Sequence, residues 1–165
     1  MTENFLEKLF EHNNWANLRI LDACAALNDE QLDTEPQSVT KGTIRRTLVH
    51  LVSSQYGYLR TLTLPVEERR DARSVDFAEL KESAIESGAG LLAIAQGEQQ
   101  PLESPLQTRD GYFVDPWVLM VQIINHATEH REQIKSMLSA LGATPPDIDG
   151  WDFGFATNAL VPVSK

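Results

Sequence analysis

Four long stretches of the chain repeat apolar residues at spacings of three and four, the period of an amphipathic helix. We expect helices over residues 5–27, 43–64, 76–97 and 115–141. Asp115-Pro116 is suited to begin the last helix and Gly142 to end it. No alternation of strands and helices interrupts this pattern. It predicts an all-α fold, a four-helix bundle with one long crossover.

The segments between these helices carry turn-forming and charged residues. Residues 28–41 contain many Asp, Pro, Ser, Thr and Gly, which indicates a loop, and residues 67–74 are charged and are expected to be an exposed connection. Asp110-Gly111 suits a tight turn and predicts a small β-hairpin between the third and fourth helices. Gly88 and Gly90 are expected to weaken the third helix by about 1 kcal/mol each.

The end of the chain carries several aromatic residues. Residues 147–160 are expected to hold one short helix, whose Trp151, Phe153 and Phe155 cover an end of the bundle. The length of 165 residues is that of one domain, and we assign residues 1–165 to a single domain. No apolar run approaches the ~20 residues that a membrane span needs.

Charge and cysteine content narrow the classes of partner and compartment. Lys and Arg number 14 against 24 Asp and Glu, which gives a net charge of −10 and disfavours binding to nucleic acid or to anionic membranes. Cys24 is the single cysteine, so no internal disulfide forms, and the first residues do not resemble a signal peptide. We expect a protein of the reducing cytoplasm. Cys24 lies on an apolar stripe and is interpreted as a buried small side chain rather than a reactive thiolate.

Three of the four histidines fall within expected helices, on or beside apolar faces. His126 and His130 are spaced i and i+4, so their rings lie on one face of the helix, about 6 Å apart along its axis. Two rings placed in this way can bind one ion. His50 can supply a third imidazole, because it lies on a stripe of small residues that leaves room beside it. Three imidazoles suit zinc, nickel, iron or copper and leave a position open for water or substrate. Alternatively, the histidines are hydrogen-bonded core residues and the small stripe serves close helix packing.

Several neighbouring residues have open roles. His12 is either a fourth ligand or proton relay, or an ordinary partly exposed histidine. Glu129 completes a His-x-x-Glu-His pattern, in which Glu is a general base in some zinc peptidases, but a solvated surface residue is the favoured interpretation. Arg131 either orients an anionic substrate or is a surface charge. By their stripe positions, some amides could donate hydrogen bonds around the ligands: Asn13, Asn17 and Gln133.

Three segments in this order resemble the DinB-like family of bacterial proteins, also called damage-inducible or YfiT-like metalloenzymes. They are Asn14-Trp15-Ala16-Asn17, Thr47-Leu48-Val49-His50-Leu51 and Asn125-His126-Ala127-Thr128-Glu129-His130-Arg131-Glu132-Gln133-Ile134. The resemblance covers nearly the whole chain. It implies a four-helix bundle with a long crossover, a homodimer, and a divalent transition metal (zinc, nickel or iron) held by His50, His126 and His130.

The resemblance supports the site more strongly than any reaction. Relatives include thiol S-transferases that use bacillithiol or mycothiol, a thiol-dependent maleylpyruvate isomerase, and many members without a known reaction. We therefore expect a metal-dependent enzyme acting on a small electrophilic substrate, by transfer of a low-molecular-weight thiol in preference to hydrolysis. The alternatives are a non-catalytic metal-binding stress-response module and a purely structural dimer.

Overall fold

Most of the residues that the structure describes are helical, as the spacing of apolar residues predicts. The computed structural model describes residues 4–36, 42–69 and 76–163. Its elements are α1 (Phe5–Cys24), α2 (Asp29–Asp33), α3 (Ile44–Thr63), the 3-10 turns η1 (Val66–Glu68) and η2 (Phe77–Glu79), α4 (Leu80–Gln96), β1 (Leu106–Gln107), β2 (Phe113–Val114), α5 (Pro116–Ala140) and α6 (Gly150–Ala156). β1 and β2 pair antiparallel, so the expected hairpin is present.

Most boundaries follow local capping chemistry. The side chain of Thr43 accepts a hydrogen bond from the backbone amide of Arg46 and so begins α3. Gly142 adopts a φ of +75° just after α5, a backbone conformation that glycine adopts without strain. Asp115 precedes α5 as expected, but its carboxylate accepts a hydrogen bond from the Ser104 hydroxyl and makes no bond to the first amides of the helix.

Two expectations about the connections were wrong where the structure describes them. The supposed loop after residue 28 contains α2, because Asn28 caps a new helix and Gln31 completes a capping box with it. In the charged connection, Arg69 is 8% exposed rather than a surface residue. Residues 37–41 and 70–74 of these connections lie outside the described residues.

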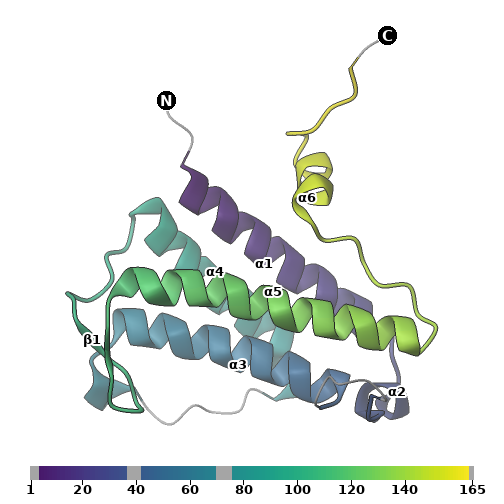
Figure 1. Cartoon of the computed structure of the whole chain (residues 1–165), viewed down its shortest axis with the longest axis horizontal. Helices are drawn as coiled ribbons and strands as arrows, with labels where there is room; N and C mark the ends of the chain where they lie inside the picture. Colours follow the sequence, from purple (N-terminus) through teal and green to yellow (C-terminus); the bar gives the residue numbers. More distant parts are fainter. Residues whose placement is uncertain (1–3, 37–41, 70–75, 164–165) are drawn as a thin grey trace.

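The four long helices contact one another in a closed ring. α1 packs against α4, α4 against α3, α3 against α5 and α5 against α1 (Figure 1). α4 runs antiparallel to α1, because its end near Ala95 contacts Asn4 while Lys81 at its start pairs with Asp22. α3 runs parallel to α4, with Gln55 beside Ser87 and Leu59 beside Gly90. The segment expected to form the long crossover between these two parallel helices includes residues 70–75, which lie outside the described residues.

Polar side chains divide the apolar core into two parts. One apolar cluster surrounds Ile20, Leu48 and Ile134, and the other surrounds Leu62 and Leu91. Between them each long helix contributes buried polar residues, which we call the polar layer: Asn13, Asn17, Gln55, Ser87 and Arg131. Such groups are stable inside a protein only when they bond one another.

The interpretation of Cys24 as a buried small side chain agrees with its position in the first apolar cluster. The side chain has no exposed surface. Burial raises the pKa of its thiol to about 12. The thiol therefore stays protonated at neutral pH and is a poor nucleophile.

Gly88 and Gly90 mark close approaches of α4 to its neighbours. A Cβ atom on Gly90 would lie 2.7 Å from Cδ2 of Leu59, and one on Gly88 would lie 2.8 Å from Oδ1 of Asn14. The Asn14 side chain has little freedom to move, because its Nδ2 donates to the Gly88 carbonyl at 2.9 Å. The small size of glycine thus offsets its cost in helix propensity.

We expect Gly88→Ala to lower the free energy of unfolding by about 1–2 kcal/mol, although alanine is the better helix former. The matched control is Gly57→Ala in α3, where a Cβ would meet nothing within 4 Å. That control should stabilise the protein by about 0.5–1 kcal/mol. Urea denaturation followed by circular dichroism measures both. Equal stabilisation by the two substitutions would contradict the close contact with Asn14.

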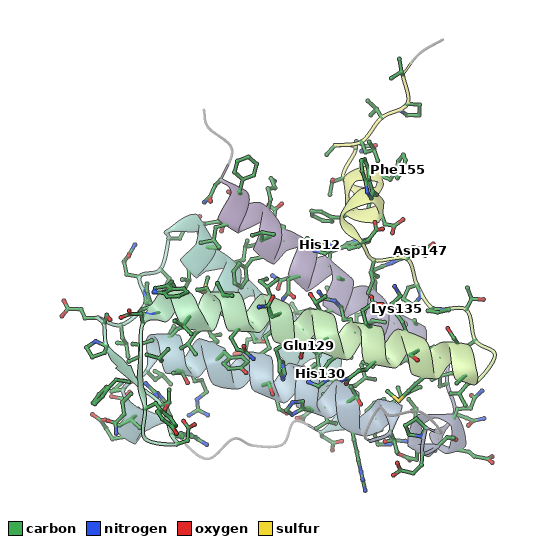
Figure 2. The ribbon with its side chains drawn as sticks, viewed as in Figure 1. His12, Glu129, His130, Lys135, Asp147 and Phe155 are labelled. Carbon is green, nitrogen blue, oxygen red and sulfur yellow. The ribbon has the colours of Figure 1, made fainter. Side chains whose placement is uncertain are left out.

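The expectation that the aromatic residues of α6 cover an end of the helices was largely wrong. Phe153 packs its ring 5.5 Å from Trp15 and 5.5 Å from His12, but Trp151 and Phe155 are 70% and 58% exposed. α6 projects beside α1 and leaves Phe155 away from the long helices (Figure 2).

None of the helices in the described segments combines the length and the apolar character required for a membrane span.

Candidate metal centre

Three histidine side chains from two helices converge at one place. The antiparallel contact of α3 with α5 brings His50 opposite His126 and His130, which lie one helical turn apart on α5. Nε2 of His126 lies 3.0 Å from Nε2 of His50 and 3.1 Å from Nε2 of His130. One ligand atom from each of the three rings lies within 4.8 Å of the other two. The structure thus brings together the three residues that the sequence singled out.

Two of the three separations between these nitrogens fit a shared metal ion. Two imidazole nitrogens that are each about 2.0–2.1 Å from zinc are about 3.0–3.4 Å apart when the angle at the metal is about 95–110°. The two Nε2–Nε2 distances of 3.0 and 3.1 Å fall at the short end of this range. Imidazole is a common ligand of zinc, nickel and iron, so the donor set also fits the expected metals.

The remaining ring nitrogens of two histidines have hydrogen-bond partners on the same helices. Nδ1 of His130 lies 2.8 Å from Oε1 of Gln133, and Nδ1 of His50 lies 3.4 Å from the Ser54 hydroxyl. An amide oxygen only accepts, so His130 carries its proton on Nδ1 and keeps the lone pair of Nε2 free. The hydroxyl oxygen can hold His50 in the same way. Nδ1–H with a bare Nε2 is the tautomer that an Nε2 metal ligand requires.

Burial and mutual repulsion keep the imidazoles of His50 and His126 uncharged. The pKa of His126 falls to about 4, chiefly because burial penalises the charged ring and further because His130 and His50 oppose a second positive charge. The pKa of His50 is lowered first by burial and then by His130. Both rings are therefore neutral at neutral pH, the state in which imidazole binds metals.

Arg131 follows His130 in sequence but points into the core. Its Nη1 donates to Oδ1 of Asn13 at 2.8 Å and to Oδ1 of Asn17 at 2.7 Å, and its side chain is buried. Desolvation lowers the pKa of its guanidinium to about 10, so it remains a cation at neutral pH. Both sequence-based interpretations, a substrate-binding residue and a surface charge, were wrong.

The amides expected around the ligands divide into two groups. Gln133 contacts His130, whereas Asn13 and Asn17 accept from Arg131 and donate to Oε1 of Gln55. The sequence did carry a signal for the second group. On α1 the two asparagines continue the three-and-four spacing of the buried side chains, which are Phe10, Asn13, Asn17, Ile20 and Cys24. A polar residue in such a series needs a buried partner.

His12 and Glu129 lie outside the histidine cluster. His12 Nε2 lies 2.8 Å from the Ile148 carbonyl oxygen, to which it donates, and its ring packs between Trp15 and Phe153. It therefore ties the C-terminal segment to α1 and supplies no fourth ligand to the cluster (Figure 2). Glu129 is exposed on α5 and contributes neither to the cluster nor to the cavity described next, which agrees with the interpretation as a surface residue.

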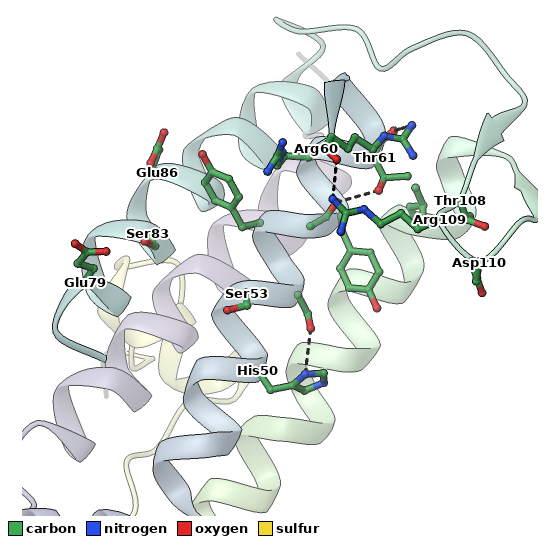
Figure 3. A pocket seen from close by; sticks show the side chains of 16 residues that line it. His50, Ser53, Arg60, Thr61, Glu79, Ser83, Glu86, Thr108, Arg109 and Asp110 are labelled. Atoms are coloured by element: carbon green, nitrogen blue, oxygen red, sulfur yellow. Dashed lines mark hydrogen bonds between the residues drawn. The ribbon is translucent and has the colours of Figure 1, made fainter. Parts of the chain in front are cut away.

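A cavity of about 840 Å³ begins at His50 and follows the outer face of α3. Ser54, Gly57 and Thr61 recur along its floor, so the stripe of small residues leaves space beside the histidines as expected. Its far end is formed by side chains from the hairpin and from Arg69, and Glu79, Ser83 and Glu86 line it from the side of α4 (Figure 3). Leu119 of α5 adds an apolar wall.

Comparison with known proteins agrees with this architecture. The curated protein DinB of Bacillus subtilis (strain 168) is 26% identical over 152 residues, covering 84% of this chain and 87% of that protein. The crystal structure of a DinB-like protein from Bacillus cereus ATCC 10987 has a similar fold, with a TM-score of 0.58 and 17% identity over 87% of this chain and 95% of the other. The model of the DinB family matches residues 1–160. The chain therefore belongs to the DinB family.

Proposed function

We propose that this protein is a metal-dependent enzyme in which His50, His126 and His130 hold one divalent ion, either zinc, nickel or iron. The observation that carries the proposal is the convergence of three imidazoles within 4.8 Å, one of which, His50, lines a cavity of about 840 Å³. A site with three protein ligands keeps a position for an exchangeable ligand, as in catalytic zinc centres.

We also propose that the chain is a four-helix bundle that forms one domain over residues 1–165, an architecture that would suit such a site. The closed ring of contacts among α1, α4, α3 and α5 is the contact pattern of such a bundle. Metal and ligand sites of bundles are built from side chains on facing helices, and α3 and α5 are such a pair. The rigid helices hold the three rings, and Gln133 and Ser54 orient two of them.

Thiol transfer to a small electrophile is the preferred reaction class. A divalent ion held by His50, His126 and His130 would supply Lewis-acid chemistry, which would lower the pKa of a thiol or water. A thiol with a pKa of about 8.5 needs far less activation than water at about 15.7. Within the described part of the chain, no carboxylate joins the histidines to act as a general base, which favours the thiol. Sulfur then forms a bond to the electrophilic carbon, and the leaving group departs with the electron pair of the broken bond.

Turnover assays test this function. Zinc-loaded and nickel-loaded protein should accelerate the reaction of chlorodinitrobenzene with added cysteine, and removal of the metal with a chelator should abolish the acceleration. His130→Ala should lose at least about 100-fold of the rate while circular dichroism shows a retained fold. The matched control is His12→Ala, which removes an imidazole outside the cluster and should keep the activity.

Two other results would change the assignment. Hydrolysis of an activated ester that depends on the metal and on His130, without any reaction of thiols, would place the protein among hydrolases. Stoichiometric metal without turnover of either substrate would favour the alternative, a non-catalytic metal-binding module of the stress response.

Gln133→Ala tests the support given to His130. Loss of the acceptor at 2.8 Å from Nδ1 frees the ring to rotate and to change tautomer. We expect zinc affinity to fall about 10–100-fold, the usual cost of removing a partner of a metal ligand. Competition titration with a fluorescent zinc chelator measures the dissociation constant. Gln122→Ala, on an exposed part of the same helix, should leave it unchanged. An equal affinity of Gln133→Ala and wild type would show that this hydrogen bond does not orient the ligand.

We further propose a homodimer that uses apolar surface on α1 and α5. Leu6 and Leu9 of α1 are apolar, but they are 42% and 50% exposed. Val121 and Trp117 of α5 are also exposed. Apolar surface of this kind is usually covered by a partner. Sedimentation equilibrium should give twice the chain mass, and Leu9→Glu with Val121→Glu should give a folded monomer. A wild-type protein that sediments as a monomer at micromolar concentration would contradict the dimer.

A further inference from the structure

Helix α6 carries apolar side chains on two opposite faces. Phe153 packs on α1, with its ring centroid 5.5 Å from those of His12 and Trp15. Trp151 and Phe155 are four residues apart, so they share the other face of the helix, and they are 70% and 58% exposed. Apolar residues on both sides are typical of a helix that is enclosed between two surfaces. The described part of the chain supplies one of these surfaces, α1.

A second exposed apolar surface lies on the N-terminal halves of α1 and α5. These two helices are in contact and run parallel, because Phe10 shares an apolar cluster with Met120 while Asn17, further along α1, bonds Arg131, further along α5. Exposed apolar residues of both helices therefore lie side by side. They are 42–75% exposed, and we call them the α1–α5 surface: Phe5, Leu6, Leu9, Trp117 and Val121.

The exposed face of α6 and the α1–α5 surface adjoin. The segment before α6 is tied to α1 where Nε2 of His12 donates to the Ile148 carbonyl oxygen at 2.8 Å. Leu9 and Phe5 lie three and seven residues before His12, so they continue the same face of α1 toward its N-terminus. Figure 1 shows α6 and the N-terminal end of α1 on the upper side of α5. Because Phe153 holds α6 beside His12, the α1–α5 surface of the same chain stays exposed.

The exposed apolar area is large enough for a dimer. At about 150–250 Å² for a complete aromatic side chain, four aromatic residues of the two surfaces together expose about 400–700 Å² per chain: Phe5, Trp117, Trp151 and Phe155. Two chains bring about 800–1,300 Å² before leucine and valine are counted, and stable interfaces bury about 1,200–2,000 Å². Two surfaces on one chain can cover each other in a twofold dimer, because each copy contributes both of them.

We propose that α6 is the contact arm of a homodimer, in which Trp151 and Phe155 of each chain pack on the α1–α5 surface of a second copy, near Leu9 and Val121. This inference rests on the homodimer proposed above and names the element that joins the two chains. Phe153 stays on the α1 helix of its own chain, so each arm is enclosed between the α1 helices of both copies. The twofold symmetry makes this contact twice.

Cross-linking between chains tests the position of the arm. Leu9→Cys and Phe155→Cys are made in separate chains, mixed at low concentration to exchange subunits, concentrated, and treated with a short bismaleimide. We expect a cross-linked dimer that contains one chain of each variant, which mass spectrometry identifies by the joined peptides. Cys24 is buried and does not compete for the reagent. The matched control replaces Phe155→Cys with Ile85→Cys, an exposed apolar position on α4 outside both surfaces, and should give no cross-link to Leu9→Cys.

Sedimentation equilibrium tests the energetic role of the arm. Trp151→Glu with Phe155→Glu should raise the dissociation constant of the dimer at least about 100-fold, because buried aromatic side chains dominate the energetics of most interfaces. α6 lies outside the ring of four long helices, so circular dichroism should show a retained fold. Ile85→Glu is the matched control, and it should change the dissociation constant less than twofold.

The results separate the arm from the dimer and from the metal site. A dimer that is disrupted by Leu9→Glu with Val121→Glu but not by Trp151→Glu with Phe155→Glu overturns the arm and leaves the homodimer standing. A wild-type protein that sediments as a monomer at micromolar concentration overturns both. Both experiments are repeated on chelator-treated protein, and an unchanged cross-link there supports the arm whether or not the histidines hold a metal.

Discussion

Replacing His126 with alanine should remove the bound metal almost completely. Nε2 of His126 is the central atom of the cluster, 3.0 Å from one neighbouring nitrogen and 3.1 Å from the other. Structural zinc sites bind with about 10–16 kcal/mol, so one ligand of three or four contributes about 3–4 kcal/mol. Its loss therefore lowers affinity by a factor of roughly 100 to 1,000.

Metal content of untagged protein, measured by mass spectrometry, gives the first readout. Wild type should carry close to one metal per chain and His126→Ala close to none, with His12→Ala as the matched control. Thermal unfolding gives the second. Zinc at a thousand times its dissociation constant stabilises the wild type by about 4 kcal/mol, or roughly 8–16 °C in Tm, and should not shift His126→Ala. Stoichiometric metal in that variant would exclude the three-histidine site.

Arg131→Met should cause the largest loss of stability among single substitutions in the polar layer. The change leaves the Oδ1 atoms of Asn13 and Asn17 without their donor inside the protein. Each orphaned acceptor costs about 1–3 kcal/mol, so we expect the free energy of unfolding to fall by about 2–5 kcal/mol. Removal of a desolvated charge opposes this loss in part.

Urea denaturation measures the effect against two other variants. Arg131→Lys keeps a cation but lacks the planar guanidinium that reaches both asparagines. Its free energy of unfolding should therefore lie between those of Arg131→Met and the wild type. Arg46→Ala, at an exposed position, should change the unfolding free energy by less than about 0.5 kcal/mol. A Met variant as stable as the wild type would show that the buried charge costs as much as its hydrogen bonds contribute.

Much of the fold could be predicted from the sequence because its signals are local. Apolar spacing and capping residues located the long helices, and the Asp110-Gly111 turn located the hairpin. The sequence could predict that the three histidines meet, because each of them lies on or beside the face of its helix that was expected to point inward. Local signals fail where one residue fits two structural roles. The sequence pattern places Asn28 just after the end of the first helix, whereas in the structure Asn28 caps the start of α2.

The features that could not be predicted depend on contacts between distant segments. The direction of Arg131 is set by asparagines more than a hundred positions earlier in the chain. The burial of Arg69 depends on carbonyls of α3, of the residue after it and of β1. Exposure of Trp151 and Phe155 follows from where α6 docks, which no property of its own seven residues determines.

The polar layer also determines the axial register of the helices. A slip of one helix by a turn, 5.4 Å, would leave Arg131 or Gln55 against aliphatic side chains, with several hydrogen bonds lost at once. His126 and His130 lie on α5 within one or two turns of Arg131, and His50 lies on α3 five residues before Gln55. The hydrogen bonds of the polar layer therefore keep His50 on α3 at the same height along the bundle as His126 and His130 on α5. As a result, the cluster is preorganised by the folded chain, and under the proposed function we expect one metal to replace another without rearrangement of the helices.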